Sequence, residues 1–289
     1  MIYIYKTMKP PITYPVNHYV VKVGNTVYQI DAGAEPLKHD SHRPDYVLIT
    51  HWHWDHTFGL TGAKDLDVCI PKKSLELLDP DKPLERVRNI ILAVEGGEAW
   101  EAMKPIVEAY IGRYKPISVA IKEQNNPIPL EDCPPIIKGE VSYIECPGHS
   151  EDHVCYFIDG KAFTGDNMAP GWNITLIDPL SYISSLYKLM SVNWSIAYPG
   201  HGEPLDRASA TKYIVETISS KIKRMCKAAA SIENGIRIRD LMNKIYNENL
   251  SEVMRYVAAR SLIGYLKNLE TLGVVRIRRE SYPWIVEKV

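Results

Sequence analysis

The stretch His51-Trp52-His53-Trp54-Asp55-His56-Thr57-Phe58-Gly59 holds four side chains of metal-ligand type within six residues. Imidazole nitrogens and carboxylate oxygens are ligands that borderline metals such as zinc accept. The preceding run, residues 45–50 (DYVLIT), is predicted to be a buried strand that ends directly at this cluster. The sequence therefore predicts a metal site at the end of a strand.

The spacing of these four side chains predicts two metal positions. Alternate residues of an extended segment point the same way, so His51 and His53 can bind one ion. If the chain then turns into a helix, Asp55 and His56 face a neighbouring point. One short loop is thus expected to supply half of two metal sites.

Three further residues of ligand type follow predicted strands later in the chain. His149 and His201 each close a Pro-Gly-His turn, at residues 147–149 and 199–201, and the glycines allow a tight backbone turn beneath each imidazole. Asp166 follows a predicted strand over residues 162–164. Functional groups collect at such strand-to-loop junctions in layered α/β folds, so these three residues are candidate site residues.

This ordered series of motifs resembles that of the metallo-β-lactamase superfamily. The series consists of a strand ending in Asp31-Ala32-Gly33, the HxHxDH run at residues 51–56, and then His149, Asp166 and His201, spread over about 170 residues. The resemblance implies an α+β fold, in the form of a four-layer αββα sandwich. It also implies that Asp31 supports the ligand loop from behind.

The resemblance further assigns each candidate ligand to one of two metal ions. One ion is expected to be bound by His51, His53 and His149. The second is expected to be bound by Asp55, His56 and His201, with Asp166 bridging both. The candidate catalytic residues are Asp55, Asp166 and His153, and for His153 a hydrogen-bonding role beside the ligands is favoured over proton donation.

Departures from the motif narrow the choice within the superfamily. Asp166 stands where one major class of true β-lactamases has cysteine, which disfavours antibiotic hydrolysis. Flavodiiron oxygen reductases have Glu at the position of His53 and add a flavodoxin domain. The helices and hairpin expected after residue 204 resemble the lactamase-β-like protein 2 branch, associated with single-stranded RNA cleavage. The core also resembles glyoxalase II, a thioester hydrolase.

The chain length of 289 residues predicts one large domain and one smaller one. Residues 1–204 are predicted to form the catalytic domain, with a helical insertion at residues 83–125 that covers the pocket. Residues 205–289 are predicted to form a winged-helix-like domain: helices over residues 208–231, 238–246 and 251–272, then a hairpin of residues 274–278 and 284–289.

Charge is divided unequally between the two predicted domains. Residues 1–204 contain 18 Lys and Arg against 26 Asp and Glu, whereas residues 205–289 contain 16 against 9. A basic segment of this kind can bind nucleic acid. A solvated helical surface, or docking onto the acidic domain, explains it equally well, so both interpretations stay open.

Composition excludes several classes of protein. The fractions of hydrophobic (45%) and charged (24%) residues are those of an ordinary globular protein. No apolar run approaches the ~20 residues of a membrane span, and the first residues do not resemble a secretory signal, so a cytoplasmic protein is expected. The five scattered cysteines are interpreted as reduced thiols.

The metal motif predicts a hydrolase. Two divalent ions sharing a carboxylate lower the pKa of a bridging water, which then attacks a carbonyl or phosphoryl ester as hydroxide. Zinc is favoured, with iron or manganese as alternatives. A small-molecule thioester or ester is the preferred substrate, and a single-stranded endoribonuclease is the alternative. A mononuclear iron persulfide-type dioxygenase is a third, weaker hypothesis.

Overall fold

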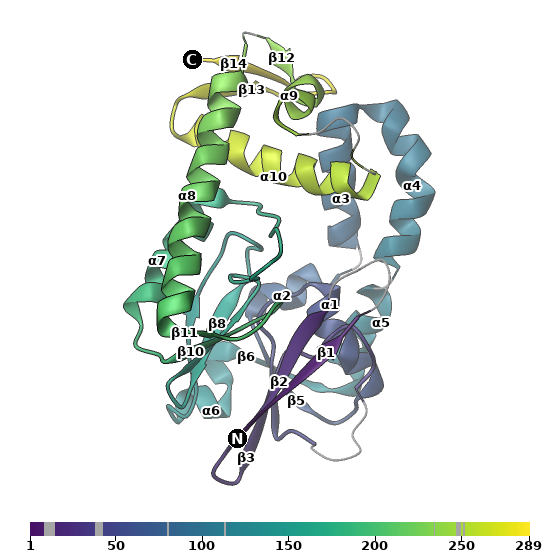
Figure 1. Ribbon diagram of the computed structural model, residues 1–289. Helices are drawn as coiled ribbons and strands as arrows, with labels where there is room; N and C mark the ends of the chain where they lie inside the picture. Colours follow the sequence, from purple (N-terminus) through teal and green to yellow (C-terminus); the bar gives the residue numbers. More distant parts are fainter. Residues whose placement is uncertain are drawn as a thin grey trace.

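Two β-sheets form the centre of this computed structural model, which describes residues 1–8, 15–37, 43–79, 81–112, 114–233, 235–246, 250 and 252–289 (Figure 1). The first sheet has the order β1-β2-β3-β4-β5-β6. Strands β1 to β3 pair antiparallel, and β3 to β6 pair parallel. The bounds are β1 Ile2–Thr7, β2 Val16–Val23, β3 Thr26–Ile30, β4 Tyr46–Leu48, β5 Asp67–Ile70 and β6 Asn126–Pro129.

The second sheet has the order β11-β10-β9-β8-β7. Strands β9 and β10 run parallel, while β7, β8 and β9 form an antiparallel meander. Strands β7 and β9 therefore point in the same direction as β10, and all three end at the same edge. The bounds are β7 Ser142–Glu145, β8 Val154–Ile158, β9 Lys161–Gly165, β10 Ile196–Pro199 and β11 Leu205–Asp206.

The inner faces of the two sheets pack against each other. One apolar cluster joins Tyr28 and Leu48 of the first sheet to Tyr156 and Phe163 of the second, and all four are buried. Burial of such large side chains contributes about 1.5–3 kcal/mol each. This contact fixes the strand ends of one sheet against those of the other, which is where the candidate ligands lie.

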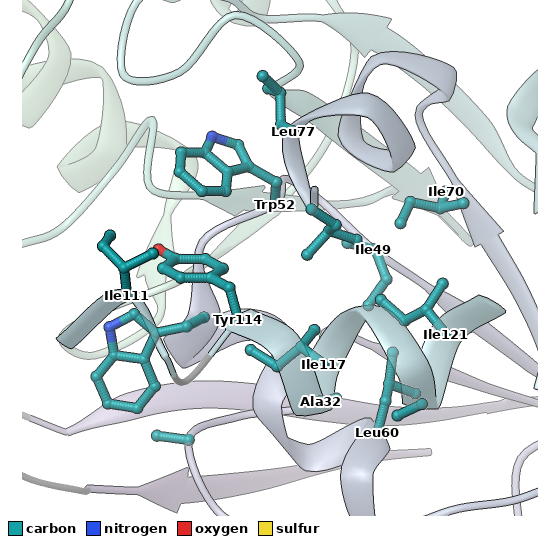
Figure 2. Packing of buried hydrophobic residues seen from close by; sticks show 14 of the residues in the cluster. Ala32, Ile49, Trp52, Leu60, Ile70, Leu77, Ile111, Tyr114, Ile117 and Ile121 are labelled. Carbon is teal, nitrogen blue, oxygen red and sulfur yellow. The ribbon is translucent and has the colours of Figure 1, made fainter. Parts of the chain in front are cut away.

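Helices cover both outer faces. Over the first sheet, Figure 2 shows Ile49, Trp52 and Tyr114 packed with side chains from the helical insertion. Over the second, Leu186 of α7 and Ile214 of α8 lie in one buried cluster. The covering helices are α1 Trp54–Thr57, α2 Lys72–Leu77, α5 Tyr114–Val119, α7 Pro179–Ser191 and α8 Arg207–Ser231, with the short helices η1 Phe58–Gly62 and η2 Ala120–Gln124. The short helices η3 Leu130–Asp132 and α6 Pro134–Ile137 instead pack on the cluster between the two sheets.

The helical insertion consists mainly of two long helices that pack together, α3 Asp81–Glu95 and α4 Gly97–Ile111. They reverse at Gly96, whose φ of 90° lies in the region that favours glycine. Residues 83–125, singled out from the sequence, therefore are helical over most of their length. The insertion rises from the first sheet toward the C-terminal region (Figure 1).

The C-terminal region contains the elements that periodicity predicted and one more strand. Its elements are α8, β12 Ile236–Arg237, α9 Ile238–Ile245, α10 Glu252–Thr271, β13 Val275–Arg278 and β14 Ile285–Lys288. The three strands form a sheet of order β12-β14-β13. This region packs on the insertion. Arg255 pairs with Glu95 at 2.6 Å, and the backbone N–H of Trp284 donates to the carbonyl of Ala93 at 2.8 Å. Helix α10 thereby lies across the top of the sheets (Figure 1).

The prediction that all five cysteines are reduced is wrong for one pair. Cys69 on β5 and Cys133 after η3 form a disulfide, with Cα atoms 5.7 Å apart and a sequence separation of 64 positions. Both side chains are fully buried. Scattered spacing and an odd count concealed this pair, because only tertiary packing brings the two positions together. Buried disulfides are typical of oxidising compartments and of the intracellular proteins of hyperthermophiles.

Among the described residues, none of the helices combines the length and the apolar character needed to cross a membrane.

Candidate metal centre

The seven ligand candidates lie where strands of both sheets end. His51 and His53 are in the loop that leaves β4, and Asp55 and His56 are on the short helix α1 that follows. His149 follows β7, Asp166 follows β9 and His201 follows β10. The ends of these strands meet, so residues far apart in sequence become neighbours.

The structure arranges these side chains in two groups. In each group the potential ligand atoms all lie within 4.8 Å of one another. The first group comprises His51, His53, His149 and Asp166, and the second comprises Asp55, His56 and His201. The structure thus brings together the residues that the resemblance assigned to each ion, with Asp166 in the first group, and their binding of metal stays a prediction.

Three imidazole nitrogens converge in the first group. The Nδ1 atom of His53 lies 2.9 Å from Nε2 of His51 and 2.8 Å from Nε2 of His149. One hydrogen on Nδ1 of His53 can be donated to only one of these two nitrogens, whereas one cation can be bound by all three. Ligands about 2.0–2.1 Å from one zinc ion lie roughly 3.3 Å apart, and neighbouring ligand atoms of this group lie at comparable distances: 2.8 Å between His53 and His149 and 3.2 Å between His149 and Asp166.

Asp166 lies between the two groups. Its Oδ2 is 3.2 Å from Nε2 of His149, while its Oδ1 is 3.2 Å from Nε2 of His56 and 3.3 Å from Nε2 of His201. Oδ2 of Asp55 is 3.8 Å from both of the latter imidazoles. One carboxylate thus presents one oxygen to each group, as a bridging ligand must.

Two buried polar atoms at the centre have no hydrogen-bond partner among the residues that the structure describes. They are Nε2 of His56 and Oδ1 of Asp166. Leaving such atoms unpaired costs about 1–3 kcal/mol each. Because both are ligand-type atoms and lie 3.2 Å from each other, a bound cation accounts for them, and the residues present fit a pair of divalent ions.

The electrostatics of the first group favour the protonation states that metals require. Burial, together with the neighbouring His56 and His53, lowers the pKa of His51 well below its usual value. Burial opposes ionisation of Asp166, but the imidazoles of His201, His56 and His149 together hold its pKa well below the usual range. Neutral imidazole and ionised carboxylate are the forms that bind metal. In the second group, burial opposes protonation of His56 and His201, but the Asp166 carboxylate raises the pKa of both above the usual value, and burial raises the pKa of Asp55.

Partners behind the ligands fix their orientation. Asp31 accepts from the Thr50 N–H at 2.8 Å and from Nδ1 of His56 at 2.8 Å, and the Thr50 hydroxyl lies 3.0 Å from Nδ1 of His51. The remaining contacts run from Nδ1 of His149 to the carbonyl of Thr175 and from Nδ1 of His201 to the carbonyl of Pro15, both at 2.8 Å. Asp31 therefore stands behind the ligand loop, where the motif resemblance expected it.

Gly200 is required by the close approach of the His201 turn. A Cβ at this position would lie 2.4 Å from Oδ1 of Asp166 and 2.9 Å from Cε1 of His56. Any larger residue would displace the central carboxylate.

His153 is almost fully buried beneath the ligands. Its Nε2 accepts a hydrogen bond from the backbone N–H of Asp166 at 3.0 Å. This contact holds the segment that presents Asp166 and turns the His153 ring away from solvent.

Sequence reasoning missed two polar residues next to the site. Asp152 accepts hydrogen bonds from the backbone N–H of Trp52 at 2.8 Å and from the hydroxyls of Ser74 and Ser150 at 2.5 and 2.6 Å. These bonds connect the HxHxDH loop to the loop of His149. Arg260 of α10 approaches His53 from the C-terminal region. Asp152 could have been noticed from its place beside His149 and His153, but nothing in the local sequence distinguishes Arg260 from other helix-surface arginines.

Comparison with known proteins gives one family. Residues 15–218 match the family model of the metallo-beta-lactamase superfamily. The chain is 24% identical over 272 residues to an atrochrysone carboxyl ACP thioesterase of Aspergillus fumigatus, covering 86% of this chain but only 54% of that protein. It is 24% identical over 271 residues to a beta-lactamase-like protein 2 homolog of Caenorhabditis elegans, covering 90% and 77%.

Solved structures share the fold over the whole chain. A metallo-beta-lactamase family protein from Thermus thermophilus superposes with a TM-score of 0.73 at 18% identity, covering 100% of this chain and 98% of that one. A beta-lactamase domain protein from Burkholderia ambifaria gives a TM-score of 0.69 at 14% identity, covering 100% and 91%. Both likenesses include the C-terminal region as well as the two sheets.

Proposed function

Because the chain belongs to the metallo-β-lactamase superfamily, we propose that it is a metallo-hydrolase with two metal ions that cleaves a small-molecule thioester or ester. The observation that carries this proposal is the position of Asp166, whose two oxygens face two separate groups of ligand atoms. A single metal ion would need only one of these groups of ligand atoms. The similar thioesterase of Aspergillus fumigatus supports the choice of substrate class.

The proposed roles follow the two groups. His51, His53 and His149 hold one ion, Asp55, His56 and His201 hold the other, and Asp166 binds both. Zinc is the first choice, because three neutral imidazoles and a carboxylate suit it, and iron and manganese accept the same ligands. The bound ions supply Lewis acidity and lower the pKa of a coordinated water toward 7.

The protein side chains orient the reaction. Asp166 would present one carboxylate oxygen to each group and Asp55 one to the second group, and these oxygens would accept hydrogen bonds from the attacking water and take up its proton. His153 is proposed as a positioning residue, since it reaches the reaction through the backbone of Asp166. The domain division proposed here is residues 1–204 for catalysis, with the insertion at 83–125, and residues 205–289 for a winged-helix-like domain.

Cleavage of single-stranded RNA is the second candidate, motivated by the basic charge of residues 205–289. The structure weakens this motive, because six of those basic side chains form ion pairs with acidic groups. The six are Arg237, Arg239, Lys244, Arg255, Arg278 and Arg279. A small-molecule substrate is therefore preferred.

Metal removal tests the proposed function. Protein loaded with zinc, iron or manganese should hydrolyse acyl thioesters of N-acetylcysteamine, and a chelator should abolish turnover, because the attacking water then keeps its high pKa. Re-addition of metal should restore turnover, and circular dichroism should show that the stripped protein stays folded. Undiminished turnover in metal-stripped protein, or cleavage of single-stranded RNA without any thioester turnover, contradicts the proposal.

A further inference from the structure

Helix α10 places one guanidinium beside the candidate metal centre. Nη2 of Arg260 lies 3.5 Å from Nε2 of His53 and donates to the carbonyl of His149 at 3.2 Å. Both Arg260 and His53 are partly exposed, unlike the buried His51 and His56. Within the described part of the chain, no acidic side chain forms an ion pair with Arg260.

The hydrogen on His53 decides what this contact means. His53 presents Nδ1 to the first group of ligand atoms. If Nδ1 binds the metal through its lone pair, the ring hydrogen must sit on Nε2. Nε2–H of His53 and Nη2–H of Arg260 are then two donors that face each other, and neither can accept from the other.

The other candidate histidine ligands differ from His53 in this respect. Each has an acceptor at its second ring nitrogen: the Thr50 hydroxyl for His51, the Asp31 carboxylate for His56, and the carbonyls of Thr175 and Pro15 for His149 and His201. Metal-binding histidines almost always donate this second N–H to an acceptor. Among the described residues, His53 therefore has no acceptor at its second ring nitrogen, although its position calls for one.

The charge of Arg260 points to the nature of that acceptor. A guanidinium held against the ligands of two divalent cations is repelled by them, and its partial burial removes some of its hydration. One backbone carbonyl satisfies only one of its five N–H groups. An anion that accepts from both Arg260 and His53 removes the repulsion and pairs both donors.

We propose that Arg260 and Nε2–H of His53 form an oxyanion subsite that selects substrates bearing a carboxylate or phosphate group beside the bond to be cleaved. This inference rests on the proposed function and adds a substrate class to it. The subsite is built from the helix α10 and the ligand loop, two segments about 200 residues apart. The chain is thus a hydrolase for anionic esters, with its C-terminal region supplying the specificity.

A pair of thioesters tests the subsite. Succinyl and butyryl thioesters of N-acetylcysteamine share a leaving group and an acyl chain of four carbons, and differ in a terminal carboxylate. The wild-type protein should prefer the succinyl compound. In Arg260→Gln, the ratio of kcat/KM between the two should fall roughly 30-fold through KM, the effect expected for one charge-assisted hydrogen bond. Arg260→Lys should recover part of the ratio, since it keeps the charge without the planar fork.

Arg255→Gln is the matched control. It removes the same charge from the same helix, but Arg255 pairs with Glu95 and does not reach the ligands. Its ratio should equal that of the wild-type protein. Metal content of all variants is measured first, so that a change in selectivity is not mistaken for a loss of metal.

Calorimetry gives a readout that does not depend on turnover. Succinate and inorganic phosphate are titrated separately into metal-loaded wild-type, Arg260→Gln and Arg255→Gln protein. Both anions should bind at least tenfold more weakly to Arg260→Gln alone, and the tighter of the two identifies carboxylate or phosphate as the natural group. Butyrate, which can reach the metals through one carboxylate only, should bind less tightly than succinate.

Two results would overturn the inference. In the first, Arg260→Gln keeps the wild-type ratio of kcat/KM between the two thioesters and the wild-type affinity for both anions. Arg260 then has only a structural role, through its hydrogen bond to the carbonyl of His149. In the second, the wild-type protein prefers the butyryl compound. In either case loss of turnover on metal removal still supports the hydrolase, so the failure of the subsite is distinguishable from failure of the proposed function. If Arg260→Gln loses its metals, Arg260→Lys decides, because it should then fold, keep both ions and show the reduced preference.

Discussion

Asp166→Ala is expected to lower thioester turnover by roughly 1,000-fold or more, which corresponds to about 4 kcal/mol of transition-state stabilisation. Within the described ranges, Asp166 is the one side chain that presents an oxygen to each group of ligand atoms. Its removal deprives both proposed metal ions of a ligand and of the negative charge between them. The two ions then repel each other without compensation, and at least one should be lost.

The measurement is kcat together with metal content per chain. Asp159→Ala is the matched control, because Asp159 is exposed in the turn that precedes β9 and pairs only with the neighbouring Lys161. This control should keep wild-type turnover and metal content. If Asp166→Ala turns over within tenfold of the wild-type rate, the bridging role is wrong.

His56→Ala is expected to remove one metal ion and leave the other. Nε2 of His56 belongs to the second group, while the first group keeps all four of its candidate ligands. Turnover should fall by roughly 1,000-fold, because one ion alone cannot both polarise the ester and generate the nucleophile as effectively. Elemental analysis should then give about one metal per chain.

His18→Ala serves as the control for His56→Ala. His18 on β2 is a buried imidazole that stacks on Tyr5 and belongs to neither ligand group. Burial and the nearby His56 lower its pKa to about 4, so it is neutral in the folded protein. This variant should retain both metals. Equal metal loss in the two variants, or full occupancy in His56→Ala, contradicts the division into two groups.

The local chemistry of the centre could be predicted from the sequence, because it depends on short motifs at strand ends. The strand before His51 and the helices after residue 204 were expected from local signals, and β4 and α8 lie where these signals expected them. The grouping of His149, Asp166 and His201 with residues 51–56 came from the family resemblance, and the structure brings these residues together.

Features that depend on distant contacts were not predictable. The Cys69–Cys133 disulfide joins a strand to a loop 64 residues away, and the spacing of the cysteines in the sequence does not indicate this pairing. Arg260 and His53 are in contact although 207 positions separate them in sequence. The apolar periodicity of a helix predicts which of its residues are buried, but not which of its polar residues contact a distant loop. Strand β1 was missed for another reason: it is an edge strand with exposed side chains at Ile4 and Tyr5, so it lacks the alternation that marks a buried strand.

Anomalous diffraction from crystals grown with zinc, iron or manganese tests the central claim most directly. We expect two peaks about 3.5–4 Å apart, with the Asp166 carboxylate between them. One peak should lie among His51, His53 and His149, and the other among Asp55, His56 and His201. A single peak at full occupancy, or peaks away from Asp166, would contradict the claim that this chain holds a pair of metal ions.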